Sequence, residues 1–218
     1  MASSRVILVA TTNPGKVREL RALLGDTVQW QSLADFPGVT EVEEDGATFA
    51  ENARKKALGY AQATGLWTLA DDSGLVVDAL GGAPGVNSAR FAGARAQGED
   101  RKTVDRRNME KLLGLLEGVP REKRTARFVC YLCLASPEEV LLETQGTVEG
   151  LIAEEPAGTG GFGYDPVFLV PQLGRTVAQL GEEEKNAISH RGNAMRRLKP
   201  LLAELLSALS NKGADRRY

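Results

Sequence analysis

The sequence predicts an α/β protein of 218 residues built on a mixed β-sheet. Near its start, an apolar run at 5–10 passes into a short polar loop and then into apolar residues at helical spacing. Such a strand–loop–helix unit is typical of parallel sheets. Further along, two apolar segments at 128–134 and 140–149 flank a Ser-Pro turn, which predicts an antiparallel hairpin. This length suits one domain or two lobes sharing a sheet, and we expect a single domain over residues 1–218.

The bulk composition is that of an ordinary globular protein, with 42% hydrophobic and 26% charged residues. A net charge of −2 argues against general electrostatic binding to nucleic acid or to a membrane surface. The sequence has neither a signal-peptide pattern nor an apolar run of membrane-spanning length. We therefore expect a cytoplasmic protein that binds neither nucleic acid nor membrane.

The two cysteines, Cys130 and Cys133, lie in a segment whose composition is typical of a strand. Residues three apart on a strand face opposite ways, so these thiols cannot meet at one metal ion. We expect two core thiols in a reducing compartment.

The first loop is a candidate phosphate site, because a strand-to-helix turn directs backbone N–H groups and the positive helix end at one point. Its residues are Thr11, Thr12, Asn13, Pro14, Gly15 and Lys16. It is not a Walker A loop, since that motif needs a glycine where Ala10 stands. The alternative is a plain turn with a surface lysine.

Further helices are expected at 48–64, 101–116 and 176–187, with a last helix from 194 onward. Leu112, Leu115 and Leu116 are among the apolar residues of the second of these. Pro200 should kink or split the last helix. Weaker patterns predict strands at 28–32 and 167–170.

The helix at 48–64 has two recognisable features. Thr48 and Glu51 fit a capping box at its start. Lys55 and Lys56 are expected on its polar side, with one of them able to reach a phosphate.

A polar triplet, Asp71, Asp72 and Ser73, follows an apolar lead-in and is expected at a strand end. Adjacent carboxylates at such a place suit a hard cation, which takes oxygen ligands. Neighbouring strand residues face opposite ways, so Asp71 and Asp72 should have different roles. A polar turn is the alternative. The acidic loop at 41–45, which includes Glu43 and Glu44, is either a solvated turn or a further source of metal oxygens opposite Asp72.

A glycine-rich loop at 155–165 leads into Phe162, Gly163, Tyr164 and Asp165. Flat aromatic side chains beside exposed backbone suit a nucleobase, although they can equally fill a core.

His190 is the only histidine, which excludes a histidine-rich metal centre, and no G-x-S-x-G pattern supports a serine triad. Arg191 beside it offers a planar fork of donors for phosphate or a base carbonyl. The pair is therefore a candidate for ligand binding, although a lone histidine is more often structural.

Five segments together resemble the inosine/xanthosine triphosphate pyrophosphatase family. They are ATTNPGKVREL, TFAENARKKA, LADDSGLVVDALGGAPGVNSARFAG, EPAGTGGFGYDPVF and EEKNAISHRGNA, in the family's order and over most of the chain. Each is weakly specific alone, and the five together are highly specific. Two departures are Thr12, where members often have glycine, and Pro200 in the last helix.

The resemblance implies an elongated α/β fold with a long mixed sheet, helices packed on it and an active site in the cleft between two lobes. It also implies a homodimer and Mg²⁺-dependent hydrolysis of dITP, ITP or XTP to the monophosphate and pyrophosphate. By matching position, Asp72 would bind Mg²⁺ and activate water, with Glu43 or Glu44 joining it and Glu43 the closer match. The residues matched to substrate binding are Thr11 to Lys16, Ser73, Phe162 to Asp165, Lys185, His190 and Arg191.

Selectivity would follow from hydrogen bonding, because hypoxanthine and xanthine carry a carbonyl at C6 where adenine carries an amine. A donor such as Arg191, aimed at that carbonyl, would reject ATP because the amine of adenine leaves the donor without a hydrogen-bond acceptor. Three alternatives remain open: a pyrophosphatase for modified pyrimidine triphosphates, a non-catalytic nucleotide sensor, and a nucleic-acid-binding module, which the acidic balance disfavours.

Overall fold

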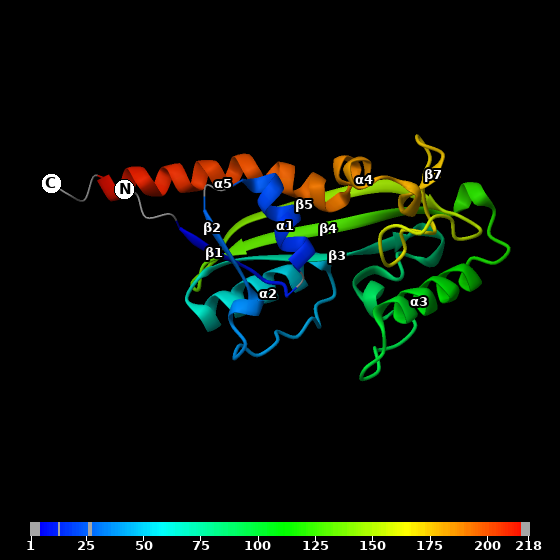
Figure 1. The fold of residues 1–218 in the computed structure, drawn as a ribbon, viewed down its shortest axis with the longest axis horizontal. Helices are drawn as coiled ribbons and strands as arrows, with labels where there is room; N and C mark the ends of the chain where they lie inside the picture. The colour runs from blue at the N-terminus through cyan, green and yellow to red at the C-terminus, as the bar shows by residue number, and fades with distance from the viewer. Residues whose placement is uncertain (1–4, 13, 26–27, 215–218) are drawn as a thin grey trace. The chain divides into compact units, whose positions relative to one another are not determined.

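A computed structural model describes residues 5–12, 14–25 and 28–214, with only the backbone at 14–16, 19 and 212–214 (Figure 1). The chain divides into two compact units. Unit 1 comprises the described residues of 1–72, 131–146 and 192–218, and unit 2 comprises residues 73–130 and 147–191.

Among the described residues, the sheet contains seven strands in the order β2-β1-β3-β4-β5-β6-β7. They are β1 (Val6–Val9), β2 (Gln29–Ser32), β3 (Trp67–Val77), β4 (Thr125–Ala135), β5 (Val140–Ile152), β6 (Phe168–Val170) and β7 (Arg175–Thr176). β1 runs parallel to β2 and β3, whereas β6 runs antiparallel to β5 and β7. The sheet is therefore mixed, and the predicted α/β class is confirmed.

The helices are α1 (Pro14–Leu24), α2 (Phe49–Thr64), α3 (Arg101–Leu115), α4 (Glu182–Ile188) and α5 (His190–Ala214). In the segments that the structure describes, short 3-10 turns lie at Leu33–Asp35, Asp78–Leu80, Gly85–Arg90, Arg121–Lys123 and Val177–Gln179. Within the described ranges, no helix combines the length and the apolar character that crossing a membrane requires.

In unit 1, α2 packs through alanines, which allow its backbone to approach the strands closely. Ala53 and Ala57 contact Ala70 of β3 together with Cys133 and Ala135 of β4. Asn52 and Lys56, each next to one of these alanines in the sequence, are buried with them.

The start of α2 is capped as predicted at Thr48, whose Oγ1 accepts a hydrogen bond from the Glu51 N–H at 3.1 Å. Glu51 reaches back one residue further than a standard capping box, to the N–H of Ala47 at 2.8 Å. Both local contacts fix the point at which the acidic loop passes into the helix.

Unit 2 has its own core, formed by larger side chains of β3, β4, β5 and β6 with α3. Leu75, Leu112, Ile152 and Phe168 are fully buried in it. Of the apolar residues at the end of α3, Leu115 is half exposed, while Leu116 just beyond the helix is buried. The apolar face of α3 therefore turns away from Leu115 at the helix end.

Both cysteines lie on β4 and are fully buried, as expected for core thiols. Burial raises the pKa of the Cys133 thiol to about 12, so the neutral thiol is the form present at neutral pH.

Three boundary predictions were wrong. β3 does not end at the acidic triplet but continues through Asp71–Ser73, because apolar residues flank the triplet on both sides. Helix α4 begins at Glu182, six residues later than expected, because Arg175 and Thr176 pair with β6 and Gln179 accepts the N–H of Thr176.

The third correction concerns α5, which begins at His190 and runs without a break through Pro200. Leu198 and Leu202, on either side of the proline, are both buried. Packing on both sides therefore offsets the hydrogen bond that proline removes.

Candidate active site

The polar triplet lies just beyond the point where β1 stops pairing with β3. That ladder ends at Val9 and Leu69, and the N–H of Ala10 donates to the Leu69 carbonyl at 2.9 Å. In open α/β sheets, ligands bind at the carboxyl ends of parallel strands. Asp72 is buried with 8% of its surface exposed, while Asp71 and Ser73 are half-buried, consistent with the alternation of side chains along a strand.

The ammonium of Lys56, on α2, lies among oxygen atoms of three acidic residues of the same unit. Its Nζ donates to the Asp71 carbonyl at 2.6 Å, and lies 3.0 Å from Glu44 Oε1 and 3.7 Å from Asp72 Oδ1. We call Glu44, Asn52, Lys56, Asp71 and Asp72 the acidic cluster. The expectation that Lys56 lies on the polar side of its helix was wrong, since only 8% of it is exposed.

Asn52 joins the acidic loop to Asp72 and was missed by sequence reasoning. Its amide Nδ2 donates to Asp72 Oδ2 at 3.1 Å, and its Oδ1 accepts the N–H of Gly46 at 2.7 Å. A Cβ at Gly46 would lie 2.7 Å from Asn52 Oδ1, so this close approach requires glycine. The signal for Asn52 and Lys56 is their i, i+4 spacing inside the stripe of buried alanines on α2.

The two buried charges perturb each other's pKa. Burial raises the pKa of Asp72 above its ordinary value, although Lys56 and Asn52 lower it in part. Burial alone would lower the pKa of Lys56, but Asp71, Glu44 and Asp72 outweigh it and the pKa is raised. The ammonium therefore stays charged and compensates the carboxylates.

The structure brings Glu44 to Lys56, while Glu43 is exposed. The neighbouring Lys55 instead pairs with Asp45. Within the part of the chain that is described, no three histidine, cysteine or carboxylate side chains are grouped so that they could hold a metal ion. An open site remains compatible with Mg²⁺, which is commonly held by one or two carboxylates together with substrate phosphates.

The predicted strand–loop–helix unit is present, with α1 beginning at Pro14. Thr11 closes the end of β1, because its N–H donates to the Val9 carbonyl at 2.7 Å and its carbonyl accepts from Leu33 at 3.2 Å. Thr12 is exposed. Asn13 lies outside the described residues, as do the side chains of Pro14 and Lys16, so the phosphate role of this loop stays a prediction.

In unit 2, the aromatic loop (residues 158–165) presents one of its two aromatic side chains outward. The ring of Phe162 is half exposed. Tyr164 is buried, and its hydroxyl donates to the Ser88 carbonyl at 2.8 Å. Burial raises the pKa of that hydroxyl. Tyr164 thus fills the core, which was the alternative interpretation for these aromatics.

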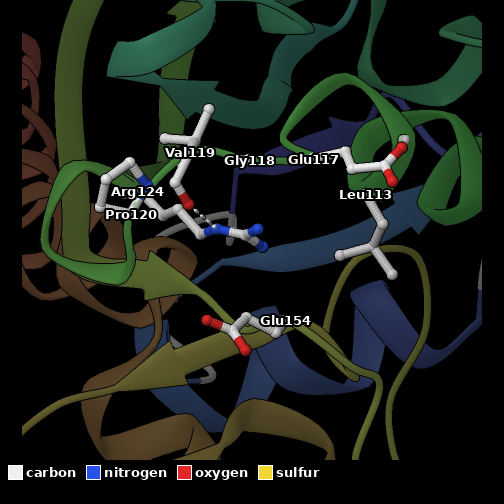
Figure 2. A pocket seen from close by; sticks show the side chains of 8 residues that line it. Leu113, Glu117, Gly118, Val119, Pro120, Arg124 and Glu154 are labelled. Carbon is white, nitrogen blue, oxygen red and sulfur yellow. Dashed lines mark hydrogen bonds between the residues drawn. The ribbon is translucent and has the colours of Figure 1, made fainter.

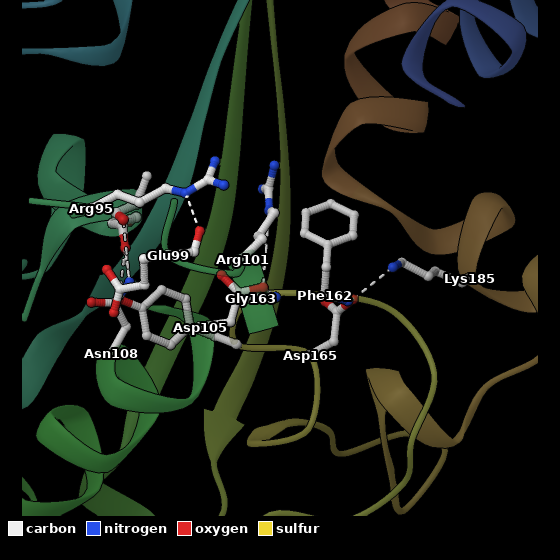
Figure 3. A network of polar contacts seen from close by, with 12 residues as sticks. Arg95, Glu99, Arg101, Asp105, Asn108, Phe162, Gly163, Asp165 and Lys185 are labelled. Atoms are coloured by element: carbon white, nitrogen blue, oxygen red, sulfur yellow. Dashed lines mark hydrogen bonds and ion pairs between the residues drawn. The ribbon is translucent and has the colours of Figure 1, made fainter. Parts of the chain in front are cut away.

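Two carboxylates hold the backbone at Phe162: Asp165 accepts the N–H of Phe162, and Asp105 accepts the N–H of the next residue, Gly163 (Figure 3). Asp165 Oδ2 accepts the N–H of Phe162 at 2.9 Å and the ammonium of Lys185 at 2.6 Å. Gly161 has a φ of +75°, and a Cβ there would overlap the Asp165 carboxylate. The Phe162 ring also lies close to two cations, with Lys185 Nζ 4.8 Å and the Arg101 guanidinium 5.4 Å from its centroid.

Three of the predicted residues, Asp165, Lys185 and His190, line one small cavity of unit 2. His190 stacks on Phe128 with ring centroids 5.0 Å apart, and Arg191 beside it is 8% exposed. The cavity holds about 20 Å³, which is room for about one water molecule and not for a purine.

A larger cavity of about 440 Å³ lies at the end of α3 and contains none of the predicted residues (Figure 2). Arg124, 6% exposed, forms part of its wall. Its guanidinium donates to the carbonyls of Leu116 and Val119, each at 2.9 Å, and of Ala153 at 3.3 Å. Arg124 therefore joins the end of α3 to the strands, which is a structural role.

Known proteins resemble this chain over nearly its whole length. The model of the Ham1 family matches residues 7–201. A protein named dITP/XTP pyrophosphatase from Desulforamulus reducens is 53% identical over 200 residues, which cover 91% of this chain and 96% of that protein. One of the same name from Listeria monocytogenes is 48% identical and covers 94% of this chain and 98% of its own.

Solved structures agree with the sequence comparison. A Ham1 protein from Coxiella burnetii superposes with a TM-score of 0.83 at 43% identity, covering 92% of this chain and 99% of that one. The Staphylococcus aureus Ham1 protein gives 0.82 at 39% identity, with the same coverage. The chain therefore belongs to the Ham1 family.

Proposed function

We propose that this protein hydrolyses dITP, ITP and XTP to the nucleoside monophosphate and pyrophosphate, with Mg²⁺ as cofactor. The names of its relatives support the substrate and the reaction. The observation that carries the proposal for this chain is the buried Asp72, just past the carboxyl end of β1 and in contact with Asn52 and Lys56.

The donor set of the acidic cluster fits Mg²⁺. Carboxylate and carbonyl oxygens of Glu44, Asp71 and Asp72 already surround one cationic group, the ammonium of Lys56. Asp72 with Glu44 or Glu43 would hold the ion. When bound, Mg²⁺ supplies charge neutralisation at the phosphates and lowers the pKa of water.

Asp72 is the proposed general base. Its carboxylate takes a proton from the water whose oxygen attacks the α-phosphorus, and pyrophosphate leaves. Asn52 holds Oδ2 of that carboxylate and so sets the direction in which Oδ1, the proposed proton acceptor, points. Thr11 to Lys16 and Ser73 are the proposed contacts of the triphosphate.

Base recognition is proposed for the residues around Phe162. Its exposed ring offers a stacking surface, and the side chains of Lys185, His190 and Arg191 are the donors proposed for a purine carbonyl. The cavity beneath them is too small to enclose a base, so we infer that the base lies against the outer face of Phe162. A homodimer in the cytoplasm is a further proposal, resting on the resemblance alone.

The test is a panel of dITP, ITP, XTP, GTP, ATP and a modified UTP, each with Mg²⁺ and with EDTA. We expect fast Mg²⁺-dependent pyrophosphate release from the first three and slow release from the others. Orthophosphate as the product would contradict the cleavage site. Preference for the modified UTP would instead identify a pyrimidine enzyme, and binding without turnover a nucleotide sensor.

A further inference from the structure

We propose that Asp105 of α3 is a positioning residue that sets the nucleobase selectivity of the aromatic loop. This inference rests on the proposed function. Asp105 Oδ2 accepts the N–H of Gly163 at 2.9 Å, and the two residues are 58 positions apart in sequence. The hydrogen bond thus ties the loop to an element that is distant from it along the chain.

Two consecutive backbone N–H groups of the loop each donate to a carboxylate. The N–H of Phe162 donates to Asp165, which belongs to the loop itself and therefore fixes its internal shape. The N–H of Gly163 donates to Asp105, which belongs to α3 and therefore fixes where the loop stands on unit 2 (Figure 3). The Gly163 N–H belongs to the peptide group that directly follows Phe162, so the second bond holds the backbone beside the exposed ring.

Arg101 supports the same arrangement from one turn earlier on α3. Its Nε lies 4.0 Å from Asp105 Oδ2, and its guanidinium lies 5.4 Å from the centroid of the Phe162 ring. The side chain of Asp105 is 19% exposed, so solvent screens its interactions only in part. A hydrogen bond from a backbone amide to a carboxylate is stronger than one between neutral groups.

The inference predicts a specific kinetic effect. Stacking on Phe162 acts on the bound substrate and on the transition state alike, so misplacing the ring should raise KM and leave kcat nearly unchanged. For Asp105→Ala we expect the KM for dITP to rise about tenfold, the size of effect that loss of one hydrogen bond to a charged group produces. The preference for dITP over dGTP should fall, because the hydrogen bonds that read the base depend on its position.

The chain offers a matched control on the same helix. Glu110 forms an i, i+4 pair with Arg106 as Asp105 does with Arg101, but the side chains of this pair are 69% and 70% exposed. Glu110→Ala should therefore keep wild-type KM and selectivity. Asp105→Asn retains an acceptor oxygen and should recover most of the lost affinity.

Amide hydrogen exchange over residues 158–165 provides a readout independent of turnover. Exchange should be faster in Asp105→Ala than in the wild type and unchanged in Glu110→Ala. An unchanged KM in Asp105→Ala, or a loss confined to kcat and melting temperature, would overturn the inference. If the wild type hydrolyses no nucleotide, the proposed function fails, and unchanged exchange in Asp105→Ala would separately overturn the role of Asp105 in holding the loop.

Discussion

Asn52 is a neutral side chain in direct contact with the proposed base. It is 1% exposed, and its amide bridges the backbone of Gly46 and the carboxylate of Asp72. A buried amide keeps both hydrogen bonds only if its two partners stay in place, so Asn52 couples the acidic loop to the proposed base. We therefore expect Asn52 to contribute both to the stability of the fold and to the proposed catalysis.

Replacing Asn52 by alanine should impair both properties. The change leaves the Gly46 N–H and one Asp72 oxygen without this partner, at a cost of about 2 kcal/mol in the free energy of unfolding. We expect kcat for dITP to fall at least about tenfold, because the proposed base is no longer held in one orientation. Urea denaturation and steady-state kinetics measure the two effects.

A matched control is available in unit 2. Asn108 is 2% exposed and also bonds to backbone, through Ala92, Ser88 and Ala89. Asn108→Ala should lose a similar amount of stability with a much smaller fall in kcat. Equal losses of kcat in the two variants would mean that Asn52 acts on folding alone.

The residue scale also shows what sequence can predict. Thr48 is predictable as a cap because its partner Glu51 is local. Asn52 and Lys56 are not, because their partners Asp72 and Glu44 lie on other elements and become neighbours only through tertiary packing.

The two aromatic residues of the loop make the same point. Tyr164 and Phe162 look alike in sequence. In the folded chain, Tyr164 packs in the core of unit 2 and its hydroxyl donates to the Ser88 carbonyl, whereas the ring of Phe162 is half exposed. A pattern of glycines and aromatics therefore predicts a loop with a flat surface, but not which ring provides that surface.

At the scale of elements, an ion pair joins α2 to β5. Arg54 Nε and Nη2 donate to the two carboxylate oxygens of Glu143, at 2.5 and 3.0 Å. This two-pronged geometry is the form of surface ion pair that contributes measurably to stability. The hydrogen bond from Arg54 lowers the pKa of Glu143 below its ordinary value of 4.5.

The lowered pKa predicts a pH-dependent stability. The contribution of Glu143 is present above pH 4.5 and is lost as the pH falls through the lower pKa of the folded state. At neutral pH, Glu143→Gln should cost about 0.5 kcal/mol, a small value because the partners are partly exposed. The difference from the wild type should vanish in acid, as followed by urea denaturation across the pH range. A difference that persisted unchanged in acid would contradict the assignment.

Element boundaries are harder to predict than element types. The residues of β3 at 71–74 are turn formers by local preference, yet the strand continues because both flanking segments are apolar and buried. Pro200 does not end α5, because Leu198 and Leu202 are buried on either side of it. Tertiary packing overrides local preference in both cases.

At the scale of the whole molecule, three strands carry the chain through both units. β3, β4 and β5 each contribute residues to unit 1 and to unit 2. The acidic cluster belongs to unit 1, and the aromatic loop, Lys185 and His190 belong to unit 2. The predicted site residues therefore form two groups, each with its own internal hydrogen bonds.

This division predicts that chemistry and recognition can be separated by mutation. The central claim is that Asp72 activates water, while residues around Phe162 bind the base. The most direct test measures Asp72→Asn in two assays, pyrophosphate release from dITP with Mg²⁺ and equilibrium binding of dITP. We expect kcat to fall by about 10³-fold, within the range for loss of a general base, while the affinity for dITP stays within about threefold of wild type. Turnover at the wild-type rate would contradict the account, because the carboxylate at position 72 would then have no part in the reaction.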